Sequence, residues 1–133
     1  MNIVITLPGS LIDEICDGRK VAEMRKSAPR HLRVGSDGFF CVEKGTRHVR
    51  CWCRVDKILK SSEPLDVCFY YAGKLGVSSE YIKEYMANKK QVYLWHIGKV
   101  KEFLPHAVIL DDLLVDRAPQ QFVYAPLSHG ESY

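Results

Sequence analysis

Residues 18–26 of the chain are Gly18-Arg19-Lys20-Val21-Ala22-Glu23-Met24-Arg25-Lys26. Glycine tolerates the left-handed conformation in which many helices end, so Gly18 predicts the end of a helix. The residues that follow are expected to be extended, which places Glu23 and Arg25 on the same face of a strand. Lys20 lies at the junction between helix and strand, where its amine can reach a phosphate or a carbonyl group.

The sequence on either side of this junction predicts further strands. Upstream, a β-branched run at residues 3–7 predicts a first strand, and Ser10 is expected to be the N-cap of the helix that ends at residue 18. Downstream, residues 39–43 and 48–58 predict a hairpin, because a Lys-Gly-Thr turn separates two alternating runs.

The second half of the chain continues this pattern. A helix is expected to begin near Pro64, and Ser78 is the expected N-cap of another. Residues 91–100 give the clearest strand pattern in the chain, and residues 108–115 and 122–124 are expected to be extended. The predicted fold class is therefore α+β, with a small, mostly antiparallel β-barrel and inserted and flanking helices.

Length and composition predict one domain over residues 1–127, followed by a polar tail at residues 128–133. The chain has 133 residues, 47% of them hydrophobic, and no apolar stretch near the ~20 residues that a membrane span needs. Residues 1–8 lack the basic region and cleavage site of a signal peptide. Five cysteines, an odd number, predict free thiols in a reducing compartment. These features together predict a cytoplasmic protein.

A metal site is an alternative role for some of the cysteines. Cys51 and Cys53 share one strand face, and His48 and His96 are further candidate ligands. The spacing is Cys-x-Cys, however, whereas structural zinc sites use Cys-x-x-Cys. We favour small core residues as the interpretation, so the sequence predicts no metal and no cofactor.

Positive charge is concentrated in one third of the chain. Residues 19–60 contain twelve Lys or Arg and four acids, a net charge of +8, whereas the remainder carries −5. Such asymmetry is typical of a surface that binds a polyanion, and the alternative is a solvated strand surface.

Four local patterns resemble one protein family. Residues 18–26 are similar to the G-x-K-x-x-E-x-R pattern of ASCH domains, and Ser27-Ala28-Pro29 to an R-K-x-x-P extension found in a phage and bacterial branch. Residues 88–97 resemble the K-K-x-x-Y-x-W-H-I strand of that branch. Residues 117–120, Arg-Ala-Pro-Gln, followed by Phe122 and Tyr124, resemble its C-terminal segment.

The resemblance implies a PUA-like fold with a cleft beside the first helix that accepts a nucleotide or a nucleic acid. A carboxylate can accept from an exocyclic amine, and a guanidinium can donate to phosphate or a base carbonyl, so Glu23 and Arg25 suit such a cleft. An internal Glu23–Arg25 ion pair that fixes the strand is the alternative. Tyr93 and Trp95 share a face and could stack a base; equally, they are suited to the core. The predicted ligand-binding residues are Lys20, Glu23, Arg25, Lys26, Arg30, Tyr93 and Trp95.

Some ASCH relatives hydrolyse the acyl group of N-acylcytidines with a lysine, a threonine three residues later and a distant glutamate. Lys20 matches the lysine, but Glu23 occupies the threonine position, and the glutamate position falls near Lys74, with Glu80 and Glu84 close by. Other relatives are described as ribonucleases, for which Lys20 and Glu23 are the candidate catalytic residues. His96, on the opposite face from Trp95, is predicted to be structural.

Three functional hypotheses follow. The first is a module that binds RNA or a modified nucleotide, with DNA as a further candidate partner and no membrane. The second is a hydrolase that acts on RNA or a nucleoside through Lys20 and Glu23. The third is a phage or bacterial accessory factor that acts by binding another protein.

Overall fold

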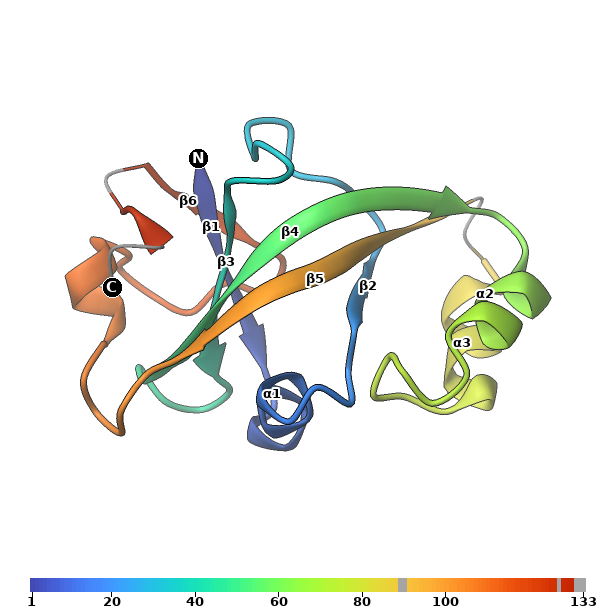
Figure 1. The fold of residues 1–133 in the computed structure, drawn as a ribbon, viewed down its shortest axis with the longest axis horizontal. Helices are drawn as coiled ribbons and strands as arrows, with labels where there is room; N and C mark the ends of the chain where they lie inside the picture. The colour runs from blue at the N-terminus through green and yellow to red at the C-terminus, as the bar shows by residue number, and fades with distance from the viewer. Residues whose placement is uncertain (89–90, 127, 131–133) are drawn as a thin grey trace.

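The chain folds around one six-stranded mixed sheet with three α-helices and a 3₁₀ helix, an α+β arrangement (Figure 1). The computed structural model describes residues 1–88, 91–126 and 128–130. Along the chain the elements are β1 (Asn2–Leu7), α1 (Gly9–Cys16), β2 (Ala22–Arg25), β3 (Gly38–Glu43), β4 (Val49–Ser61), α2 (Pro64–Tyr70), α3 (Ser79–Met86), β5 (Val92–Glu102), η1 (Leu110–Leu113) and β6 (Val123–Ala125).

The strands lie in the order β2-β5-β4-β3-β1-β6. β1 pairs with β3 in parallel, and the other described pairings are antiparallel, which confirms the mostly antiparallel character. The long strands β4 and β5 run side by side across the molecule (Figure 1). Within the described ranges no ladder joins the short edge strands β2 and β6, so the sheet is open there and closure into a barrel is not confirmed.

Alternation along the strands fills two cores, one on each face of the sheet. Ile3 and Ile5 of β1 belong to the core covered by α1, whereas Val4 belongs to the core that contains Leu110 and Leu113 of η1. A third core packs α2 and α3 against β2 and β5, at the end of the molecule away from β6 (Figure 1). No helix among the described residues is both long and apolar enough to cross a membrane.

The predicted helix ending is confirmed, but the predicted beginning is wrong. Gly18 has φ +80°, the left-handed conformation expected after a helix. At the other end Pro8 is the N-cap, and its carbonyl accepts from the backbone N–H groups of Leu11 and Ile12. Ser10 lies inside the first turn, because α1 begins directly after the turn that ends β1.

Residues 108–115 do not form the predicted extended segment. Ile109 makes an isolated bridge to His48, and η1 follows it. The Asp112 side chain accepts from the Ile109 N–H at 2.9 Å, a local cap that favours the 3₁₀ turn. The predicted cap at Ser78 is confirmed, because its side chain accepts from the Tyr81 N–H. Residues 89–90, the two lysines of the quoted K-K-x-x-Y-x-W-H-I segment, lie outside the described residues.

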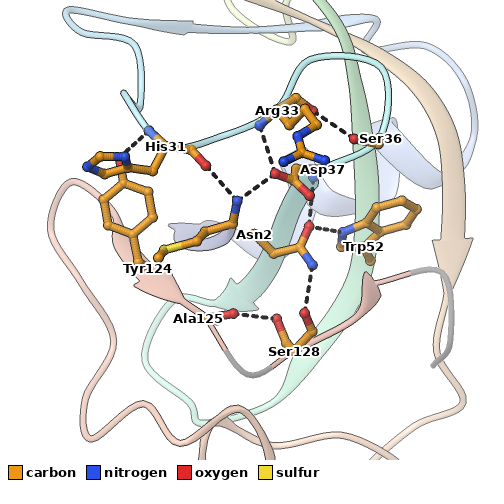
Figure 2. Close-up of polar contacts among 11 residues, drawn as sticks. Asn2, His31, Arg33, Ser36, Asp37, Trp52, Tyr124, Ala125 and Ser128 are labelled. Carbon is orange, nitrogen blue, oxygen red and sulfur yellow. Dashed lines mark hydrogen bonds and ion pairs between the residues drawn. The ribbon is translucent and has the colours of Figure 1, made fainter.

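Asn2 ties both ends of the described chain to the sheet (Figure 2). Its side-chain oxygen accepts from the Gly38 N–H at 2.8 Å and from the Trp52 indole at 3.2 Å, and its amide donates to the Ser128 carbonyl at 3.2 Å. Residues 128–130 of the predicted polar tail therefore lie against the sheet, and residues 127 and 131–133 lie outside the described part. The His31 N–H donates to the Tyr124 hydroxyl, which anchors the basic loop at residues 30–38.

Candidate functional site

A cavity of about 470 Å³ lies where α1, β2, α3 and the segment before β6 meet. It is large enough for a single nucleotide, since ligand pockets usually measure about 300–1,000 Å³. Both polar and apolar side chains line it. The lining residues are Leu7, Pro8, Leu11, Lys20, Glu23, Met24, Arg25, Lys26, Leu75, Val77, Tyr81, Tyr85, Gln120 and Gln121.

Lys20 is held at the inner end of this cavity. The side chain is 3% exposed, and its Nζ donates to the Ala22 carbonyl at 3.0 Å and the Leu75 carbonyl at 2.6 Å. Glu23 Oε1 lies 3.1 Å away from the same nitrogen. The turn that supplies the Leu75 carbonyl approaches closely because Gly76 has no side chain; a Cβ there would lie 3.3 Å from the lysine stem. The ammonium thus has three acceptors, as many as it has protons.

Glu23 joins Lys20 to Arg25. The second carboxylate oxygen of Glu23, Oε2, accepts from Arg25 Nε at 3.0 Å and from Nη2 at 2.8 Å. The other terminal nitrogen of Arg25 donates to the Gln121 carbonyl at 3.0 Å, and the guanidinium lies 5.8 Å from the centre of the Trp95 ring. The two interpretations of this pair are compatible: Glu23 and Arg25 form an internal ion pair, and both line the cavity.

The buried charges of Lys20, Glu23 and Arg25, which we call the charged triad, sum to +1. Burial alone would raise the pKa of the Glu23 carboxyl, but the positive charges of Lys20 and Arg25 and their hydrogen bonds outweigh burial and lower the pKa. Glu23 is therefore ionised at neutral pH. With exposed Lys26 at the rim, the cavity has a surplus of positive charge and suits an anionic ligand.

Two tyrosines of α3 provide an aromatic wall. Tyr81 is 48% exposed, and its ring stacks on that of Tyr85 with centroids 6.0 Å apart and planes 24° apart. The pKa of Tyr85 is raised, chiefly by burial, so the hydroxyl stays protonated. A planar ligand in the cavity would meet this pair.

The structure gathers some of the predicted ligand-binding residues and separates the others. Lys20, Glu23, Arg25 and Lys26 line the cavity. Tyr93 and Trp95 do share a face, but they pack in the core under α1, and Trp95 is fully buried with its indole donating to the Ser27 carbonyl at 3.2 Å. Arg30 is exposed in the loop and does not line the cavity.

The sequence prediction missed Gln120, Gln121, Tyr81 and Tyr85. Gln120 ends the quoted Arg-Ala-Pro-Gln segment, which was a signal that could have placed it at the site. The tyrosines have the spacing of one helix face, a signal that does not distinguish a cavity wall from helix packing. Of the acids considered for an amidohydrolase, Glu80 and Glu84 are exposed and do not line the cavity.

A second cavity, also about 470 Å³, lies beneath α2 and is lined by residues of α2, β4 and β5. His96 lines it, and its Nε2 shares a short hydrogen bond with the Tyr71 hydroxyl. Burial, helped by the charge of Lys57, lowers the pKa of His96, so the ring is neutral at pH 7. Lys57 and Lys60 at its margin are exposed. His96 therefore has a hydrogen-bonded position on the face opposite Trp95.

Among the structures that resemble this fold is that of ASCH from Zymomonas mobilis. Its TM-score is 0.77 at 17% identity, over 92% of this chain and 86% of that chain. A serine-to-alanine variant of that protein gives 0.77 at 18% identity, over 98% and 91%. A tyrosine-to-phenylalanine variant gives 0.75 at 17% identity, over 98% and 93%. No family model matches the sequence. No curated protein matches it either. The fold is that of the ASCH domain, as the motifs predicted.

Proposed function

We propose that this chain, which has the ASCH-domain fold, binds a nucleotide in the cavity beside α1, presented by single-stranded RNA or as a free modified nucleotide. The observation that carries the proposal is the charged triad, whose surplus positive charge is buried in the wall of a nucleotide-sized cavity. A buried cation in a fixed position attracts an anion more strongly than a solvated one, because water screens it less.

Each part of the cavity has a counterpart in a nucleotide. The Arg25 guanidinium has five N–H groups, of which Nε, one on Nη2 and one on Nη1 have partners within the triad and Gln121. Within the described part of the chain the other two have no acceptor, so they can donate to a phosphate or a base carbonyl. Tyr81 and Tyr85 offer a stacking surface of the kind that binds unpaired bases.

The same contacts weigh against a hydrolase that uses Lys20 and Glu23. Lys20 donates to three acceptors, and both oxygens of Glu23 accept hydrogen bonds, so a ligand would have to displace existing partners. A carboxylate with a lowered pKa is also a weak general base.

The test is binding of fluorescent single-stranded RNA at low and moderate salt, with DNA of the same sequence alongside. Lys26→Ala removes a rim charge and should reduce the salt dependence by about 0.7 in the slope of log K against log salt, the value for one phosphate on a single strand. Lys44→Ala, at an exposed turn outside the cavity, is the matched control and should leave the slope unchanged.

Absence of RNA and DNA binding at low salt would contradict the nucleic-acid form of the proposal, and equal effects of the two lysines would contradict its location. Free nucleotides are then the remaining ligands to screen. Cleaved RNA in the binding reactions, absent with Lys20→Ala, would instead support the hydrolase.

A further inference from the structure

A cluster of cysteines lies in the core beneath α1, and none of its members lines the charged cavity. Cys41 on β3 is directly opposite Cys51 on β4, and Cys53 is two residues further along β4. Because alternate residues of a strand and directly opposed residues share a face, all three side chains point to the same core. We call Cys41, Cys51 and Cys53 the thiol cluster. The sequence suggested only the Cys51–Cys53 pair; the strand register adds Cys41.

The spacing of the sulfur atoms matches a metal site. The three Sγ atoms all lie within 4.8 Å of one another, and those of Cys51 and Cys53 are 3.9 Å apart. A zinc ion about 2.3 Å from each thiolate places tetrahedral sulfur ligands about 3.8 Å apart. Little movement of the side chains is therefore needed to bring three sulfurs around one ion.

Cys16 supplies a fourth thiol and a route from the surface. It is the last residue of α1, it is half-buried, and it packs against the core that contains the thiol cluster. Cys41, Cys51 and Cys53 are buried, so Cys16 is the cysteine of this core that an ion from solvent can reach first.

We propose that Cys41, Cys51 and Cys53, with Cys16 as fourth ligand, bind one thiophilic cation of the Zn²⁺ or Cu⁺ class. Soft thiolate ligands select such ions over Mg²⁺ or Ca²⁺. Binding replaces S–H bonds with S–metal bonds and releases one proton for each protonated thiol that coordinates. The alternative is that the thiols are small core side chains with no affinity for metal.

The experiment adds equimolar Cd²⁺ to the reduced, metal-free full chain and records sulfur-to-cadmium charge-transfer absorption, proton release and the midpoint of thermal unfolding. We expect the absorption band to appear, at least three protons to be released and the midpoint to rise, since an ion that binds only the folded state stabilises it. Zn²⁺ should compete with Cd²⁺ and abolish the band.

Variants locate the site. Cys53→Ala should lose the band, and Cys16→Ala, at a half-buried position that tolerates change better, should weaken Cd²⁺ binding and release one proton fewer. Cys68→Ala is the matched control: Cys68 lies on α2, its thiol donates to the Ser79 carbonyl, and it packs in a different core. If the original chain shows no band, or if Cys68→Ala loses it while Cys16→Ala retains full affinity and proton release, the proposal is wrong.

Discussion

The cavity beside α1 and the cavity beneath α2 have the same volume, but the charged side chains that line them differ in burial and pairing. Beside α1, Lys20 and Glu23 are buried and Arg25 is nearly so, and each charge is neutralised or bonded by another member of the charged triad. Beneath α2, the lysines are exposed, and the part-buried polar pair, Tyr71 and His96, is neutral.

Buried, paired charges and exposed charges contribute differently to ligand binding. Burying a charge carries a desolvation penalty, and a buried charge without a partner destabilises the fold. Charges already fixed in position, however, bind an incoming anion without losing side-chain entropy. Exposed lysines keep their hydration and so have no desolvation penalty, but water screens their attraction for an anion. The cavity beside α1 is therefore the better candidate for specific recognition, and substitutions should affect the two cavities unequally.

The largest expected effect is on stability. Glu23→Gln leaves Lys20 and Arg25 without their shared counter-ion inside the protein and should lower the free energy of unfolding by about 3–5 kcal/mol. Lys60→Ala, at the margin of the second cavity, should change it by less than about 0.5 kcal/mol. Urea denaturation of both variants checks this. Similar losses in the two variants would remove the distinction between the cavities.

The next effect is on ligand affinity. Tyr81→Ala removes a stacking ring and should weaken binding of single-stranded RNA by about 1–3 kcal/mol. Tyr70→Ala is the control, because Tyr70 is 72% exposed and lines the second cavity instead. Fluorescence anisotropy measures both. A larger loss in Tyr70→Ala would move the proposed site to the cavity beneath α2.

A smaller effect is expected on the pH dependence of stability. Because the pKa of Glu23 is lowered by folding, its ionised form stabilises the native state above the unfolded pKa of about 4.3, and this contribution is lost as pH falls through the lower native value. The difference in stability between the original chain and Glu23→Gln should be constant at neutral pH and shrink below about pH 4.3. Urea midpoints measured across this range test it; a difference independent of pH would contradict the ionised assignment.

The smallest effect is a titration shift in the second cavity. Burial and the charge of Lys57 lower the pKa of His96 from its usual 6.5. In NMR titrations His96 should therefore protonate below that value. Lys57→Met should move the pKa upward, because a repelling positive charge is removed. An unchanged or lower pKa in Lys57→Met would show that Lys57 has no such influence.

Sequence predicted the local features of the molecule well and its long-range contacts poorly. The positive φ of Gly18, the cap at Ser78 and the shared face of Glu23 and Arg25 depend on a few neighbouring residues, and all are confirmed. Trp95 was a candidate for the cavity, but Phe39 and Phe122, distant in sequence, pack against its ring in the core.

The same limit explains the incomplete site. Tyr81 and Tyr85 reach the cavity only because α3 packs beside β2, and Gln121 holds Arg25 from 96 residues away. The spacing of apolar residues along the sequence does not predict contacts between segments so far apart in the chain. The resemblance to a family supplied the expectation of a cleft, whereas the arrangement of side chains around it required the fold.

The pairing of β1 with β6 affects the order in which the sheet can be completed during synthesis. Ile3 pairs with Tyr124, so one edge of β1 lacks its partner until residues 123–125 have left the ribosome. An unpaired, apolar strand edge is a site of aggregation. A nascent chain stalled before residue 123 should therefore depend more on chaperones than one that extends past β6, although β1, α1, β3 and β4 have already been made.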